Sequence, residues 1–319
     1  MAPPISEQTA FFCAVLFTLF YVAPFYLSPT LRVSGTTSRD APKVIQARVR
    51  AVGLTCIACF GVTTYILVTF DRASPAELLR LLGIWPVDFI DILTVLGLVM
   101  ILFTCSLYEA ILVDGEWRDW SPASFKEATW DSWTGYRNLI IAPASEELVF
   151  RAFTIPLFQL AGMSPVRMVF ITPLVFGLAH IHHLYAFLQA RTPKGQNLPS
   201  VNVWINGVLV SAFQFTYTSL FGFFAAFVFL RTGSVWATVV AHSFCNKMGV
   251  PRLWGRVGCY KRRSAVSSSD GTSNGVVVDP ENLSIAWTVV YYALVFVGAY
   301  GFYTLLFPLT ESSNALAAF

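Results

Sequence analysis

Two adjacent carboxylates and an arginine lie inside a stretch of the sequence that is otherwise strongly apolar. Glu146 and Glu147 are followed by Arg151, within the apolar run that starts at Asn138. Ionisable side chains at membrane depth are costly and usually serve a function. A carboxylate in a partly dry site can act as a general base on water. These residues are therefore candidates for hydrolytic chemistry.

The histidines of the chain fall in two further apolar stretches. One group contains His180 and His183, and His242 is followed four residues later by Asn246. Residues four apart share a helix face, and both His and Asn can donate hydrogen bonds to an oxygen that gains negative charge. We expect a neutral imidazole at His180 to lie near Glu146, His242 and Asn246 to form an oxyanion site, and His183 to have a supporting role.

Helical phase separates the two carboxylates. At about 100° per residue, Arg151 lies about 40° from Glu147 but about 140° from Glu146. A glutamate four residues before an arginine has the favourable order and spacing for an ion pair. The sequence therefore predicts that Arg151 neutralises Glu147 and that Glu146 faces a cavity.

The composition is that of an integral membrane protein. Hydrophobic residues make up 55% of the 319 and charged residues 12%, against roughly 25% charged residues in soluble proteins. The net charge of +3 gives no reason to expect a nucleic-acid partner. Apolar runs of roughly 20 residues predict an all-α polytopic bundle of about eight transmembrane helices in the lipid bilayer. The predicted spans are 9–28, 46–70, 88–113, 137–160, 166–188, 203–230, 233–250 and 284–308.

The basic residues orient these spans. Of the 21 Lys and Arg, 15 lie in the segments 29–50, 114–137, 189–200 and 251–283, which the positive-inside rule assigns to the cytosol. Glu146, His180 and His242 then all fall in the cytosolic half of the membrane, where they can meet. We expect a single membrane-embedded domain over 1–319, with its motif-bearing core at 137–250 and a flexible cytosolic loop at about 255–283.

Three motifs, in this order, resemble those of the CAAX protease and bacteriocin-processing superfamily. Glu146-Glu-Leu-Val-Phe-Arg151 is similar to its EExxxR motif, Phe176-Gly-Leu-Ala-His180 to FxxxH, and His242-Ser-Phe-Cys-Asn246 to HxxxN. Arg137-Asn138 and Phe213-Gln-Phe-Thr-Tyr-Thr218 resemble the flanking residues of the eukaryotic members, the type II CAAX prenyl endopeptidases.

The resemblance implies a multi-pass protease of the endoplasmic reticulum membrane that removes the C-terminal tripeptide from prenylated CAAX proteins such as Ras- and Rho-type GTPases. It also implies a conical cavity that opens to the cytosol and laterally to lipid, and no cofactor. The family roles, carried onto this chain, are water activation by Glu146 and His180, oxyanion stabilisation by His242 and Asn246, and support by Glu147 and Arg151.

Two other hypotheses stay open at this point. The first keeps the peptidase but places a zinc ion on Glu146, His180 and His242, although the chain has no helix-borne His-Glu-x-x-His pattern. The second is a non-catalytic membrane binder or transporter in which the same groups hold an ion or a proton. Asn246 could also serve only to bridge two helices.

Overall fold

The computed structural model describes residues 3–28, 30–31, 38–193, 198–260, 280–281 and 283–319. Its α-helices are α1 Glu7–Val22, α2 Pro24–Leu27, α3 Pro42–Ile66, α4 Pro75–Leu81, α5 Phe89–Leu102, α6 Thr104–Tyr108, α7 Pro122–Lys126, α8 Trp133–Tyr136, α9 Ala142–Glu147, α10 Ile155–Leu160, α11 Pro165–Ala179, α12 His182–Arg191, α13 Val201–Thr232, α14 Val235–Met248 and α15 Ile285–Leu305. Two-residue strands β1 Cys259–Tyr260 and β2 Pro280–Glu281 pair antiparallel. Most of the predicted flexible loop, residues 261–279 and 282, lies outside the described residues.

The prediction of an all-α, polytopic membrane protein is confirmed. Five helical segments are long and apolar enough to cross a bilayer, and a sixth is added if α5 and Thr104–Val113, which meet at an angle of 77°, form one broken span. The five are Glu7–Leu27, Pro42–Asp71, Pro165–Gln189, Val201–Thr232 and Ile285–Leu305. The predicted number of eight spans is not confirmed.

The two remaining predicted spans, 137–160 and 233–250, are the ones that carry charged or polar motifs. Helix α14 has 14 residues, about 21 Å of helix, which is less than the roughly 30 Å of a hydrocarbon core. The other segment is helical from Trp133 to Ala152 and contains Arg137 besides the two glutamates and Arg151. Both segments are therefore helices that other helices must shield from lipid.

The helix that carries the two glutamates is not a regular α-helix. A π-helical turn, η5 Arg137–Ile141, precedes α9, and a second, η6 Leu148–Ala152, follows it. Pro143 lies in the first turn of α9, where its missing N–H removes one α-helical hydrogen bond. Single π turns inside helices are frequent at functional sites.

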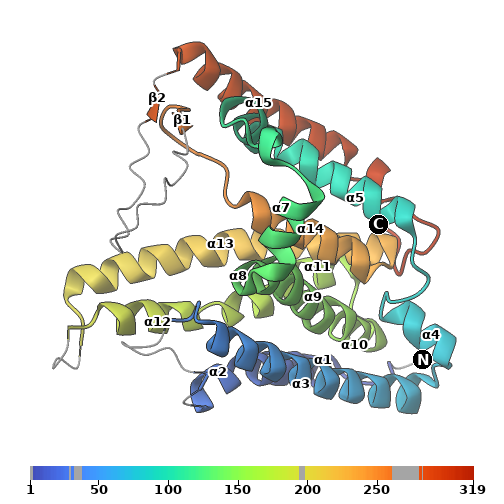
Figure 1. Cartoon of the computed structure of the whole chain (residues 1–319). Coiled ribbons are helices and arrows are strands. Elements are labelled where there is room, and N and C mark those ends of the chain that lie inside the picture. The colour runs from blue at the N-terminus through green and yellow to red at the C-terminus, as the bar shows by residue number, and fades with distance from the viewer. Residues whose placement is uncertain (1–2, 29, 32–37, 194–197, 261–279, 282) are drawn as a thin grey trace.

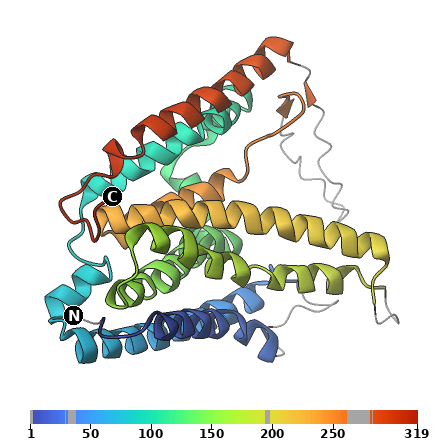
Figure 2. The same cartoon turned by 180° about the vertical axis from the view of Figure 1, so that it is seen from behind.

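The helices pack in three layers, with the motif-bearing helices in the middle (Figures 1 and 2). Helices α1 and α3 lie side by side on one face, and α5 with α15 lie on the other. The middle layer contains α9 to α14, of which α11 and α13 pack closely against each other. The site is therefore enclosed by helices on two sides.

Small residues let α11 and α13 approach closely beside the site. A Cβ atom on Gly222 of α13 would lie 2.6 Å from the Cβ of Pro173 in α11 and 3.4 Å from the guanidinium of Arg151. Only a residue without a side chain fits there, and small residues have the same role at other helix contacts inside membranes. Gly222 thus brings α13 against the charged part of the motif helix.

Candidate active site

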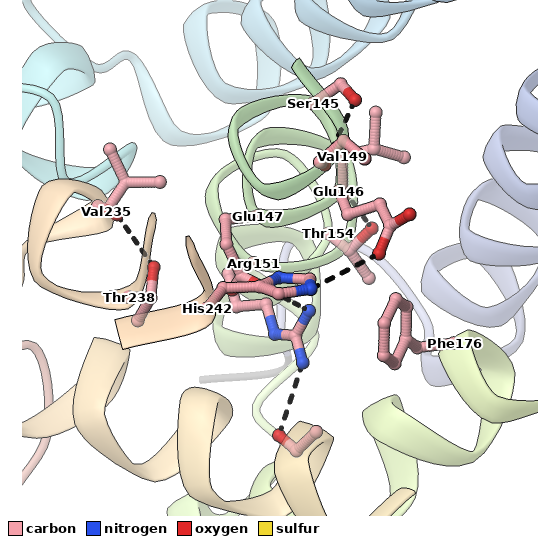
Figure 3. A network of polar contacts seen from close by, with 12 residues as sticks. Ser145, Glu146, Glu147, Val149, Arg151, Thr154, Phe176, Val235, Thr238 and His242 are labelled. Carbon is pink, nitrogen blue, oxygen red and sulfur yellow. Dashed lines mark hydrogen bonds and ion pairs between the residues drawn. The ribbon is translucent and has the colours of Figure 1, made fainter. Parts of the chain in front are cut away.

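Glu147 lies at the centre of a buried network of charged groups (Figure 3). Its side chain is completely buried, and its Oε1 accepts a hydrogen bond of 3.0 Å from Arg151 of the next helical turn. The same oxygen lies 2.7 Å from Nδ1 of His242 in α14. The predicted ion pair between Glu147 and Arg151 is therefore confirmed, and His242 is a further partner of the carboxylate.

Arg151 connects this network to the two neighbouring helices. Its guanidinium lies 4.6 Å from the ring centre of Phe176 in α11, and it also makes a 3.5 Å contact with the carbonyl oxygen of Gly222 in α13. A buried ion pair is stable only if further contacts compensate the loss of water around both charges. These contacts hold Arg151, and through it Glu147, in one position.

His242 lies between the two carboxylates. Because Oε1 of Glu147 can only accept a hydrogen bond, the ring nitrogen that faces it, Nδ1, carries the hydrogen. The other nitrogen, Nε2, lies 3.8 Å from Oε2 of Glu146, which is too long for a direct hydrogen bond. In the neutral ring Nε2 is an acceptor, so His242 can donate from Nε2 only as the imidazolium.

Glu146 lines a cavity that it shares with the histidines of α11 and α12. The cavity has a volume of about 160 Å³, and its lining includes Glu146, His180 and His183. A single water molecule needs only about 10–15 Å³ of such a cavity, so the space is larger than one water requires. Glu146 is 17% exposed whereas Glu147 is fully buried. The predicted division of the pair, with Glu146 facing a cavity and Glu147 neutralised, is confirmed.

His180 directs one ring nitrogen toward its own helix. It is the residue that ends α11, and its Nδ1 lies 2.9 Å from the carbonyl oxygen of Phe176. A carbonyl accepts, so Nδ1 carries the hydrogen and Nε2 of the neutral ring keeps a lone pair. The ring of His183 packs 5.9 Å away, centre to centre. His180 therefore has one nitrogen available as a hydrogen-bond acceptor.

Asn246 does not line the cavity, and neither does His242. The exposed side-chain amide of Asn246 donates a 3.0 Å hydrogen bond to the carbonyl oxygen of Asn138, which does line the cavity. Ser243, one turn earlier in α14, donates to the carbonyl oxygen of Leu139. Both contacts attach α14 to the π turn η5, so the structure gives Asn246 the helix-bridging contact that the sequence left open.

Comparison with known sequences points to the same family as the motifs. Residues 128–248 match the family model described as type II CAAX prenyl endopeptidase Rce1-like. A probable CAAX prenyl protease 2 of Schizosaccharomyces pombe is 35% identical over 242 residues, which cover 76% of this chain and 81% of the relative. The chain belongs to the type II CAAX prenyl endopeptidase family.

Other members of the family are similar over shorter parts of the chain. A human CAAX prenyl protease 2 is 39% identical over 182 residues, 54% of this chain and 50% of the relative, and one from Arabidopsis thaliana is 39% identical over 119 residues, 37% and 35%. No solved structure matches the chain. As a CAAX prenyl endopeptidase, the protein is a peptide hydrolase that acts on prenylated proteins. All the candidate site residues lie within 128–248.

One wall of the endopeptidase's cavity comes from residues that the motifs did not indicate. Helices α1 and α3 contribute Tyr21, Phe25 and Arg48, among others, and these helices precede the region that the family model matches. The hydroxyl of Tyr21 lies 2.9 Å from that of Ser145, next to Glu146. The spacing of these residues gives no sign that they line a functional cavity, because each belongs to an ordinary apolar span. Only the packing of α1 and α3 on the motif helix brings them to the site.

Among the residues that the structure describes, no group of three or more His, Cys, Asp or Glu side chains is arranged to hold a metal ion. The zinc hypothesis needs Glu146, His180 and His242 on one ion. Glu146 and His180 line the cavity, but His242 does not. The hydrogen bond from Nδ1 of His242 to Glu147 would itself be compatible with zinc on Nε2. The three donors do not converge on one ion as they stand in the described structure, and metal removal is left to experiment.

Proposed function

We propose that this endopeptidase removes the C-terminal tripeptide from prenylated CAAX proteins such as Ras- and Rho-type small GTPases, with Glu146 as the general base. One observation carries the proposal. Of two adjacent glutamates, one is buried and neutralised by Arg151, while the other borders a cavity together with His180. A carboxylate that lacks its own counter-ion and faces a space for water is suited to accept a proton.

In the proposed reaction, a water molecule between Glu146 and His180 attacks the carbonyl carbon of the prenylated cysteine. Glu146 accepts one proton of the water, and the lone pair of His180 Nε2 orients the other. A C–O bond forms, the carbonyl oxygen becomes an oxyanion, and the C–N bond of the tetrahedral intermediate then breaks. The proton held by Glu146 passes to the leaving nitrogen, so that the tripeptide departs as an amine.

The oxyanion would be stabilised from α14. His242 can donate from Nε2 as an imidazolium, and Glu147 on Nδ1 would compensate the positive charge and fix the ring. The side-chain amide of Asn246 has two N–H groups, of which one is used on the carbonyl of Asn138. The second N–H is proposed to donate to the oxyanion, which requires the substrate carbonyl to reach beyond the cavity lining toward α14, because neither His242 nor Asn246 lines the cavity itself. Glu147 and Arg151 would position His242 rather than contact the substrate.

The membrane setting fits this substrate class. The basic segments support a cavity in the cytosolic half of the membrane, where a C-terminal CAAX tail would arrive, and the endoplasmic reticulum is the proposed location. The prenyl group can stay in lipid while the peptide enters the cavity. Because the bond to be cut lies next to the lipid anchor, a site within the membrane reaches it without extracting the prenyl chain.

Cleavage of a farnesylated CAAX peptide by the purified full chain tests the proposal. Replacement of the general base by Glu146→Gln should lower kcat by about 10²- to 10⁴-fold, while thermal unfolding and the size-exclusion profile stay those of the wild type. Full activity after metal chelation is expected, and loss of activity that zinc restores would favour the zinc hypothesis. Unchanged cleavage by Glu146→Gln would contradict the proposed base and favour a binding or transport role for these groups.

A further inference from the structure

Most of the charged residues that line the cavity beside Glu146 are arginines. Its charged lining residues are Arg39, Arg48 and Arg137 together with Glu146. The arginines belong to the segments 29–50 and 114–137 that the positive-inside rule places in the cytosol. On that assignment, the guanidinium groups lie nearer the cytosol than Glu146, which follows Arg137 by nine residues along the motif helix.

Arg48 has no carboxylate partner within ion-pair distance among the described residues. Its Nε and one terminal nitrogen both donate to the carbonyl oxygen of Leu31, at 3.1 and 2.9 Å. Its guanidinium carbon lies 4.7 Å from the ring centre of Phe25. These contacts orient the guanidinium but do not neutralise it. A half-buried cation without a counter-ion is costly, and an anionic ligand would offset that cost.

Arg137 is held by hydrogen bonds to its neighbour Asn138 and to the residues that precede α3. Its Nε donates to Asn138 at 2.8 Å, and one terminal nitrogen donates to the carboxylate of Asp40 at 2.9 Å. That same nitrogen also donates to the carbonyl oxygen of Arg39 at 3.2 Å. Arg137 is 15% exposed, whereas Arg39 is 55% exposed. Two preorganised guanidinium groups, on α3 and on η5, thus border one space.

We infer that Arg48 and Arg137 bind the C-terminal carboxylate of the substrate and so help to fix the position of the cut. The planar guanidinium matches a carboxylate and can donate two parallel hydrogen bonds to it. This inference rests on the proposed function, because it needs the scissile bond to lie at Glu146. An anionic lipid headgroup is less favoured, because the arginines border the cavity that contains Glu146 and His180.

The dimensions agree with a tripeptide. Three extended residues span about 10 Å. Arg137 precedes Glu146 by nine residues of continuous helix, which is about 13 Å along the axis. The length of the arginine side chains accounts for the difference between these two distances. A carboxylate held at this end therefore places the third peptide bond from the C-terminus close to Glu146, while a longer or shorter tail would place another bond there.

The test compares two farnesylated CAAX peptides that differ only at the last group, a free carboxylate or a carboxamide. Purified full-length protein in detergent without added phospholipid should cleave the acid with a kcat/KM about 10- to 100-fold above that of the amide, the range expected for hydrogen bonds to a charged group. In Arg48→Gln the ratio of acid to amide should fall toward one. Arg50→Gln, an exposed arginine of the same helix that does not line the cavity, should keep the wild-type ratio.

Product inhibition gives a second measurement that needs no variant. The released tripeptide with a free carboxylate should inhibit the wild type at least about 10-fold more strongly than its amide. Arg48→Lys, which keeps the charge but loses the planar fork, should retain part of the preference and controls for misfolding of Arg48→Gln.

Several results would overturn the inference. If the wild type cleaves acid and amide equally while Glu146→Gln is inactive, the carboxylate site is wrong and the proposed function stands. If the effect of Arg48→Gln is equal for both peptides and depends on added phosphatidylserine, Arg48 binds a lipid headgroup instead. If the wild type cleaves neither peptide, the proposed function itself fails.

Discussion

At the scale of single residues, the carboxylate of Glu147 connects three helical segments. One of its oxygens contacts both Arg151 and His242, whereas its other oxygen, Oε2, is buried without a hydrogen-bond partner in the described structure. Removal of a single partner would leave a buried charge without compensation, which costs more than removal of the whole pair. The network therefore ties the position of His242 to the stability of the fold.

The first prediction concerns Arg151. Arg151→Gln should destabilise the protein by about 3–5 kcal/mol, because it leaves Glu147 charged and unpaired in the interior. Thermal unfolding of the purified protein in detergent measures the change. The double variant Glu147→Gln/Arg151→Gln should be more stable than Arg151→Gln alone.

A surface ion pair provides the control for this experiment. Arg167 pairs with Glu7 at 2.7 Å, and both side chains are partly exposed. Arg167→Gln should therefore change stability by only about 0–1 kcal/mol. An equal loss of stability in Arg151→Gln and Arg167→Gln would mean that the central ion pair is not the structural element described here.

The sequence was most informative about contacts between residues of the same helix. Phase along one helix was sufficient to pair Glu147 with Arg151 and to turn Glu146 toward a cavity. It could not identify the contact between His242 and Glu147, because phase says which side chains share a face but not which neighbouring helix meets that face. The roles in catalysis, including that of Asn246, stay predictions.

At the scale of elements, the site depends on the close approach of α11 and α13. Pro173 and Gly222 meet at this contact, and Arg151 lies beside them. Helices inside a membrane gain little from burial of apolar surface, so such contacts depend on shape. A change of one methyl group here should therefore reach the charged network.

Gly222→Ala tests this contact. The added Cβ would lie 2.6 Å from that of Pro173, so we expect a loss of about 1–3 kcal/mol from overpacking, with lower peptidase activity. The matched control is Gly53→Ala in α3, where the new Cβ would have no neighbour within 4 Å. That variant should be at least as stable as the wild type, because alanine favours a helix by up to about 1 kcal/mol. Equal unfolding temperatures for both variants would contradict the packing argument.

At the scale of the whole molecule, the motif-bearing layer is enclosed by helices that carry no motif. Apolar runs predicted where α1, α3, α13 and α15 lie, because a membrane span is defined by length and composition alone. The predicted number of eight spans is not confirmed, because the charged helix and the short α14 are not long and apolar enough to cross a bilayer without shielding by their neighbours. The contribution of α1 and α3 to the cavity depends on long-range packing, which no local pattern encodes.

The orientation of the molecule can be tested with inserted glycosylation acceptors. If the basic segments are cytosolic, an acceptor inserted between residues 114 and 121 should stay unmodified in cells. One inserted between residues 72 and 88 should be glycosylated, because that connection would face the lumen. The readout is a gel shift that an endoglycosidase removes, with peptidase activity as the control for folding. The reverse pattern would place the cavity on the wrong side for a cytosolic substrate.

The two π turns around α9 have a consequence for how such sites change in evolution. A π turn closes its hydrogen bond over one residue more than an α turn, so η5 accommodates an extra residue between the anchors at Asn138 and Leu139 and the glutamates. If the same residues formed a regular α-helix instead, α9 would be rotated by about 100° relative to α14. The carboxylate that borders the cavity would then be a different one. Which of two identical neighbours serves as the base is therefore set by the π turn upstream, and a one-residue deletion that straightens η5 should keep the same carboxylate at the cavity, whereas a one-residue deletion in a regular turn should not.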